Sequence, residues 1–252
     1  MPVTLSPSDL VLPADPWLLT THEAAVRGIG AVLARELALP LPDEVTVFVY
    51  GSRRTFEEGL VHDAHLSPPR AAELSGVARG LGRPRQILFH DADSERGREW
   101  LRLVAHELTH VCQIELAGGE RGPAQWLKEG MAEWVAFSVL ERLRLDSLSG
   151  RRESALGRVR SLALAAAPLD LDGLGSAAGF SARHRDGGAV PTYQLSFLMV
   201  DHLVARAGFA RLADYFRAFT LSGDRHENFE RAFGQTLEAF EREVLTDLAK
   251  PR

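Results

Sequence analysis

The stretch His106-Glu107-Leu108-Thr109-His110 constrains this chain more than any other feature, because it specifies a helix and a pair of ligands together. Residues four apart lie on one face of a helix, so both imidazoles can reach the same metal ion. Glu107 lies about 100° further round that helix, within reach of a water on the metal. The pattern therefore predicts a helix that carries two metal ligands and a neighbouring carboxylate.

Apolar residues repeat at helical spacing around this motif and predict one helix from Glu95 to Leu116. Gly118-Gly119 ends it, and a second helix starts near Gly122-Pro123 with proline at its first position. The second helix carries Glu129 and Glu133, four residues apart and on one face. Helices joined by a short Gly-rich turn are expected to be antiparallel neighbours, which can bring Glu129 against the histidines.

Several glutamates compete for the third ligand position. A longer pattern with glycine at 113 and histidine at 116 is excluded, because the chain has Gln113 and Leu116 there. Glu115 and Glu120 lie in or near the turn, where water could solvate them. Glu129 follows after one reversal of the chain and one helical turn, and is the preferred candidate.

The stretches H-E-L-T-H and W-L-K-E-G-M-A-E-W together resemble the gluzincin metallopeptidases, and are most similar to a small bacterial peptidase-MA-like group. The match at motif level covers roughly residues 100–135, and a looser pattern extends from about 45 to 245. The resemblance implies that His106, His110 and Glu129 bind one zinc ion per chain. It also implies a general base at Glu107.

The same resemblance implies that Glu133 orients a ligand histidine, His106. Thermolysin-like members have asparagine before the ligand glutamate and aspartate four residues after it. This chain has Lys128 and Glu133 at those positions, so the orienting contact departs from that pattern.

The resemblance implies hydrolysis of a peptide bond, and the ligand set fits that chemistry. Two neutral imidazoles and one carboxylate leave zinc with net positive charge and an open position. The metal lowers the pKa of its water to about 7, and Glu107 accepts the proton and delivers it to the leaving amine. The chain has no G-x-M-x-N motif of the gluzincin aminopeptidases, which favours endopeptidase action.

The developing oxyanion needs a second donor, for which Tyr193 is the candidate. It follows the Gly/Pro-containing loop 187–191 and opens a predicted helix from Thr192 to Ala207. Similar families often place a tyrosine here, whereas the alternative is an ordinary packing residue at a helix start. His184 is a second candidate donor, on a loop.

The pattern predicts an α+β fold: a small N-terminal α/β lobe with a short sheet, the active-site helix, and a mainly helical C-terminal lobe, as in a thermolysin-like catalytic domain. Residues 1–16 are expected to be extended, followed by a single domain over 17–252 with a sheet lobe at about 17–94 and a helical lobe at about 95–252. Strands are expected at 45–50 and 86–90, a turn at 80–85, and a short partner strand at 76–78 against a competing helix from Pro68 to Leu74. Helices are expected from Thr20 to Leu39 and at 95–117, 123–147, 151–166, 192–207, 209–221, 225–233 and 236–249.

Peptide substrates bind exposed edge strands by strand addition, and the resemblance implies such an edge here. Ile87, Leu88 and Phe89 are the candidate substrate-binding residues, because they form the last strand before the motif helix. Their apolar run also permits a buried internal strand. The long loop 167–190 is a candidate cover for the cleft.

Composition limits the partners. A net charge of −5 argues against general nucleic-acid binding. The resemblance implies a peptide or protein substrate, and the oligomeric state is left open. No apolar run approaches the ~18–20 residues of a transmembrane helix. The start Met1-Pro2-Val3-Thr4 lacks a signal-peptide pattern, which predicts a cytoplasmic protein, or an exported one if a signal or anchor was removed.

Cys112 is expected in the core rather than on the metal, and His62 with His65 is a weaker candidate metal pair.

Two alternatives to a metallopeptidase remain. The same site could hydrolyse an amide other than a peptide bond, or the chain could be a non-catalytic, metal-stabilised binding or regulatory module. The intact Glu107 argues against the second, because a purely structural site needs no base. Structural zinc also takes four protein ligands, and only three convincing ones are present.

Overall fold

The computed structural model describes residues 1–6, 8–91, 97–120, 122–163, 169–186 and 192–249. It divides into two units, one formed by residues 1–115 with 142–145 and the other by residues 116–141 with 146–252. The division falls near the end of the motif helix, later than the predicted lobe boundary at 94/95. Most of the motif helix therefore belongs with the sheet.

The first unit contains a four-stranded sheet in the order β1-β2-β4-β3. Its strands are β1 (Pro2–Thr4), β2 (Glu44–Tyr50), β3 (Gly80–Arg83) and β4 (Gln86–His90). The central pair β2 and β4 is parallel, and each outer strand is antiparallel to its neighbour. Alternating Val45, Val47 and Val49 give β2 the β-branched composition typical of strands.

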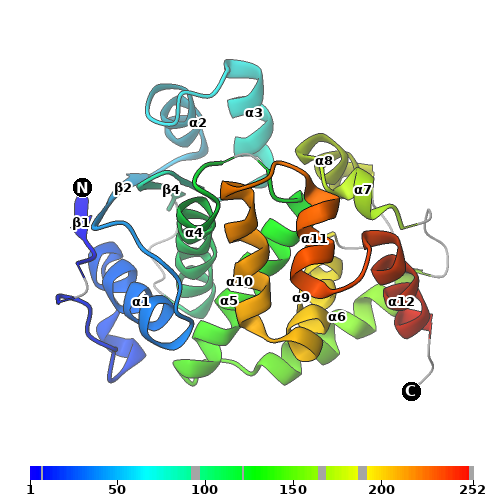
Figure 1. The fold of residues 1–252 in the computed structure, drawn as a ribbon. Coiled ribbons are helices and arrows are strands. Elements are labelled where there is room, and N and C mark those ends of the chain that lie inside the picture. Colours follow the sequence, from blue (N-terminus) through cyan, green and yellow to red (C-terminus); the bar gives the residue numbers. More distant parts are fainter. Residues whose placement is uncertain (7, 92–96, 121, 164–168, 187–191, 250–252) are drawn as a thin grey trace. The chain divides into compact units, whose positions relative to one another are not determined.

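Helices cover both faces of this sheet (Figure 1). On one face, α2 (Arg53–His62) and α3 (Pro68–Val77) bury Leu88 among the side chains of Phe56 and Leu60. On the other face lie α1 (His22–Glu36) and the motif helix α4 (Arg98–Ala117). There the ring of His22 lies 5.7 Å from that of Phe89 and 5.2 Å from that of Trp100. The motif helix is thus supported directly by the sheet.

The second unit is helical throughout its described secondary structure. Its elements are α5 (Gln125–Arg142), α6 (Leu148–Ala163), α7 (Leu171–Leu174), α8 (Ala177–Asp186), α9 (Thr192–Ala207), α10 (Phe209–Arg217), the 3-10 turn η2 (Ala218–Thr220), α11 (Arg225–Phe233) and α12 (Leu237–Ala249). Buried rings hold it together, with Trp126 stacked 5.8 Å from Phe240 and Tyr215 stacked 6.0 Å from Phe233. Gly130 allows α5 to approach α9 closely, because a Cβ there would lie 2.3 Å from the Ser196 carbonyl oxygen.

The mixed α+β composition and both central strands are confirmed. Helices α9 and α11 have the predicted bounds, and α3 replaces the short strand expected at 76–78. The strand that pairs with β4 is instead β3, where a turn was expected. Helix α2 was missed, although Ser52 and Thr55 form a capping box at its start.

Other boundaries also differ from the predictions. The cap of α1 is Thr21, whose side chain accepts from the Ala24 N–H, rather than Thr20. The single helix expected at 123–147 ends at Arg142, and Arg144 has a positive φ of 59°. The expected extended N-terminal segment contributes β1 to the sheet and the 3-10 turn η1 (Pro16–Leu18). The expected loop 167–190 contains α7 and α8, while residues 164–168 and 187–191 lie outside the described residues.

The prediction that Ile87, Leu88 and Phe89 form an edge strand is wrong. Their strand β4 is hydrogen-bonded to β2 on one side and to β3 on the other, and all three side chains are buried. The apolar run signalled an internal strand, as runs buried on both faces do. The edge beside the motif helix is β3.

Among the described residues, no helix combines the length and apolar character that crossing a bilayer requires.

Candidate metal centre

Helix α4 brings the two motif histidines together. The Nε2 atoms of His106 and His110 lie 3.2 Å apart, and the ring planes are nearly perpendicular at 82°. His106 is 7% exposed, so this pair lies at the boundary of the core rather than in open solvent. Two imidazole nitrogens this close together have the spacing of a chelating pair, and the contact is also within hydrogen-bond distance.

The spacing of these nitrogens fits zinc. Zinc binds histidine nitrogen at about 2.0–2.1 Å with tetrahedral geometry, which places two ligand nitrogens about 3.3 Å apart. The observed 3.2 Å agrees with this value. Imidazole nitrogen is also a donor that zinc prefers at catalytic sites.

Gln113 fixes the tautomer of His110. The Nδ1 atom of His110 lies 2.9 Å from the Gln113 Oε1, and because a carbonyl oxygen only accepts, Nδ1 must carry the proton. The Nε2 lone pair of the neutral ring is then available to a metal. Gln113 itself is buried, at 2% exposure. Sequence reasoning missed this role, although the spacing of three residues on one helix face was available as a signal.

Glu107 is buried beside the pair and is held by the sheet. Its Oε2 accepts a hydrogen bond of 2.8 Å from the backbone N–H of Gly82 on β3. A Cβ at Gly80 would lie 2.5 Å from the other carboxylate oxygen, Oε1. The glycines of β3 therefore shape the space that the Glu107 carboxylate occupies, and sequence reasoning had assigned them only to a turn.

Glu129 and Glu133 lie on α5, in the second unit, and each is 8% exposed. The side-chain amide of Gln125 donates to the Glu129 Oε1 over 2.7 Å. Burial lowers the pKa of the neighbouring Lys128, against the opposing effects of Glu129 and Glu120. The roles of Glu129 as third ligand and of Glu133 as orienting residue stay predictions.

Tyr193 lies in the first turn of α9, as predicted. Its ring contacts Phe180 and His184 on α8, with centroids 5.3 Å away in both cases and the planes nearly perpendicular. His184 is therefore part of a helix rather than a loop. These contacts are those of a packing residue, and the oxyanion role of Tyr193 stays a prediction.

The second unit contains another histidine near carboxylates. His202 Nε2 lies 3.0 Å from Glu243, and its Nδ1 lies 3.4 Å from Asp247. Arg206 also donates to Glu243. One ligand atom from each of the three residues lies within 4.8 Å of the others, so the group has the composition of a metal site. Its two ring nitrogens face different carboxylates, however, which is the arrangement of an ion-pair network.

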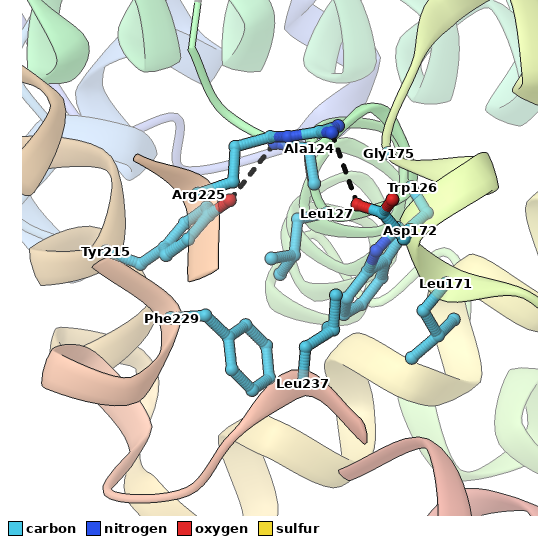
Figure 2. A pocket seen from close by; sticks show the side chains of 10 residues that line it. All are labelled: Ala124, Trp126, Leu127, Leu171, Asp172, Gly175, Tyr215, Arg225, Phe229 and Leu237. Carbon is cyan, nitrogen blue, oxygen red and sulfur yellow. Dashed lines mark hydrogen bonds and ion pairs between the residues drawn. The ribbon is translucent and has the colours of Figure 1, made fainter. Parts of the chain in front are cut away.

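A recess in the second unit is lined mainly by apolar side chains (Figure 2). The Tyr215 hydroxyl accepts from the Ala124 N–H over 3.0 Å at its rim. The recess has room for about one water molecule, which is too little for a substrate side chain. Trp126 contributes to its wall, and Trp134 stacks 5.2 Å from Phe209, so the two tryptophans pack within the second unit.

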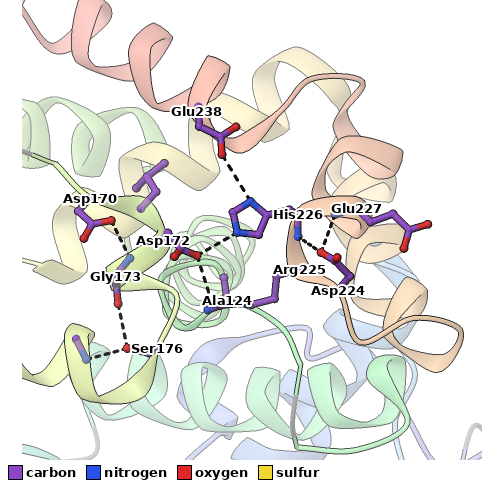
Figure 3. Close-up of polar contacts among 12 residues, drawn as sticks. Ala124, Asp170, Asp172, Gly173, Ser176, Asp224, Arg225, His226, Glu227 and Glu238 are labelled. Atoms are coloured by element: carbon purple, nitrogen blue, oxygen red, sulfur yellow. Dashed lines mark hydrogen bonds and ion pairs between the residues drawn. The ribbon is translucent and has the colours of Figure 1, made fainter.

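Charged side chains connect the helices on this part of the second unit (Figure 3). Asp172 on α7 pairs with Arg225 over 3.3 Å and with His226 over 3.1 Å, both from the start of α11. His226 also lies 3.7 Å from Glu238 on α12. These residues are largely exposed and contain no candidate nucleophile, so the network ties helices together.

The remaining candidates have structural positions. Cys112 is fully buried, as predicted, and burial raises the pKa of its thiol. His62 and His65 are exposed, and among the described residues they belong to no group with a third ligand. Comparisons of the chain with protein-family models, curated proteins and solved structures gave no match.

Proposed function

We propose that this chain is a zinc-dependent peptidase that hydrolyses peptide bonds with Glu107 as general base. The observation that carries the proposal is the pair of Nε2 atoms of His106 and His110, 3.2 Å apart and beside a buried carboxylate. A purely structural metal site does not need the carboxylate of Glu107, because that side chain is not one of the proposed ligands. Glu129 is proposed as the third protein ligand and Glu133 as the residue that orients His106.

Zinc bound there supplies a Lewis acid that polarises the scissile carbonyl and makes water more acidic. The protein residues then have separate tasks. Gln113 keeps the proton of His110 on Nδ1, so that Nε2 can bind the metal. Glu107 takes the proton of the attacking water and passes it to the leaving amine. Tyr193 is proposed as a hydrogen-bond donor to the developing oxyanion.

The proposed substrate site is the edge strand β3 rather than β4. Among the described strands, β3 is hydrogen-bonded to β4 alone and forms an edge of the sheet, and Gly82 lies against Glu107. A peptide that adds to this edge would run past the proposed base, and the Gly82 N–H, which is bonded to Glu107, would not take part in the pairing. Endopeptidase action on an extended peptide is the proposed reaction.

The test is zinc content measured together with cleavage of an unfolded, fluorescently labelled protein. Wild type and Glu107→Gln are compared, since glutamine keeps the shape of the side chain but cannot take a proton. We expect about one zinc per chain in both proteins, and turnover lower by about 10²–10⁴-fold in the variant. Equal turnover in the two proteins would rule out the mechanism, and zinc-free protein after zinc addition would rule out the site.

A further inference from the structure

Strand β3 presents a backbone N–H group at the open edge of the sheet. In an antiparallel pair, hydrogen-bonded and non-hydrogen-bonded residue pairs alternate. The His90 N–H donates to the Arg79 carbonyl over 2.8 Å, so the pairing places Gly82, opposite Ile87, at a non-hydrogen-bonded position. The N–H of Gly82 therefore points away from β4, and Glu107 is its acceptor.

Glu107 can reach the Gly82 N–H because Gly80 and Gly82 have no side chains. Gly80 and Gly82 are two residues apart, so both face α4 on the same side of the strand. A Cβ at Gly82 would lie 2.4 Å from the Glu107 backbone oxygen and 2.8 Å from the His110 Cβ. The three atoms nearest to a Cβ at Gly80 would all belong to the Glu107 side chain, with Oε1 at 2.5 Å and Cγ at 2.7 Å. The first glycine of the pair thus leaves room for the carboxylate, and the second leaves room for the helix.

We infer that Gly80 and Gly82 are positioning residues for the general base, which deepens the proposed function and rests on it. The Gly82 N–H holds one carboxylate oxygen of Glu107, and the bare Cα of Gly80 leaves space for the other. A hydrogen bond to a charged acceptor is about twice as strong as one between neutral groups, so it can select one rotamer of a long side chain. The oxygen that faces the reacting water is then fixed by the strand.

The first experiment measures this contact without any activity. In isotope-labelled, metal-free, full-length protein, amide hydrogen exchange at Gly82 is followed by NMR for wild type, Glu107→Gln and Glu107→Ala. We expect exchange at Gly82 to be faster by about 10–100-fold in Glu107→Ala, the range that loss of a charged hydrogen bond implies. Glu107→Gln keeps an acceptor oxygen and should lie between the two. Equal exchange in wild type and Glu107→Ala overturns the inference.

The second experiment separates positioning from folding. Gly80→Ala pushes on the flexible end of Glu107, so we expect kcat to fall by about 10–100-fold with unchanged KM and unchanged zinc content. Gly51→Ala is the matched control, because a Cβ there meets nothing within 4 Å. A wild-type kcat in Gly80→Ala overturns the inference, and so does loss of zinc, which would mean that β3 shapes the metal helix instead.

These results can be told apart from failure of the proposed function. If Glu107→Gln is as active as wild type, the proposed mechanism fails whatever the exchange at Gly82 shows. If Glu107→Gln is inactive while Gly80→Ala keeps the wild-type kcat, only the positioning role fails. The exchange measurement gives a result in either case, because it needs neither zinc nor substrate.

Discussion

The histidine pair on α4 and the single histidine His202 on α9 differ in where their ring nitrogens point. On α4, the Nε2 atoms of two histidines approach the same position, 3.2 Å apart. On α9, the two nitrogens of the single ring of His202 face Glu243 and Asp247 separately. The single ring of His202 contacts both carboxylates, whereas the α4 pair brings two nitrogens close together, which suits a cation. Convergence of the donor atoms, rather than residue type, distinguishes the candidate metal site.

The strongest way to break this comparison is to remove one histidine from each group. His110→Ala should abolish stoichiometric zinc binding, because it leaves one imidazole where the proposed site needs two. His202→Ala should leave zinc content unchanged. Metal analysis of the purified proteins after zinc addition and dialysis measures both. Retention of zinc in His110→Ala would contradict the metal site on α4. Loss of zinc from His202→Ala would instead place the metal at the His202 group.

Glu129→Ala should weaken zinc binding by more than 100-fold, because a charged ligand is lost rather than an outer partner. Competition with a chelator of known affinity gives the zinc dissociation constant. Glu120→Ala is the matched control, since it changes a carboxylate that the proposal does not place on the metal. If zinc affinity is unchanged in Glu129→Ala, the third ligand is Glu115, Glu120 or Glu133.

Gln113→Leu should weaken zinc binding by about 10–100-fold, the usual effect of losing an outer hydrogen bond to a ligand histidine. Leucine has a similar volume, so the core around α4 should be kept. The same chelator competition gives the affinity, and thermal unfolding of the metal-free protein checks the fold. Wild-type zinc affinity would show that Gln113 does not set the tautomer of His110.

The smallest expected effect concerns the ion pairs of the second group. Burial alone would raise the pKa of Glu243. The hydrogen bonds from His202 and Arg206 lower this pKa by more than burial raises it, so the pKa lies below the ordinary value. A carboxyl with a lowered folded-state pKa adds stability above its unfolded pKa of about 4.3 and loses it as the pH falls through the folded pKa. Glu243→Gln should therefore cost under about 1 kcal/mol at pH 7.

The difference in the free energy of unfolding between wild type and Glu243→Gln should disappear at a pH below the ordinary pKa range of carboxyl groups. Urea unfolding of both proteins at neutral pH and near pH 3 measures it. A cost that stays the same at both pH values would mean that glutamine disturbs packing rather than the ion pairs.

Local signals in the sequence predicted the elements that carry the proposed chemistry. The H-E-x-x-H spacing and its apolar repeat placed His106 and His110 on one helix, and the proline and glycine signals placed the turn after it. The strands 45–50 and 86–90 were predicted from β-branched and aromatic composition. These features depend on residues close together in the chain, which is why pattern reasoning found them.

The contacts made by β3 could not be predicted in the same way. Gly80-Leu81-Gly82 has the composition of a turn, and only pairing with β4 makes it a strand. The order of strands in a sheet depends on contacts between distant segments, so the edge was assigned to the last strand before the helix and not to β3. The bond from Gly82 to Glu107 spans 25 residues, and no local pattern encodes it.

The close approach of α5 to α9 has a consequence for recognising related chains. Gly130 directly follows the proposed ligand Glu129, yet the need for glycine comes from Ser196 and Val200 on the neighbouring helix. If the proposed function holds, a related chain without hydrolytic activity would still need glycine at this position for the close packing of α5 against α9, whereas the glutamate could be replaced. Glycine at position 130 would then indicate a shared fold, and glutamate at position 129 would indicate that the proposed metal site is intact.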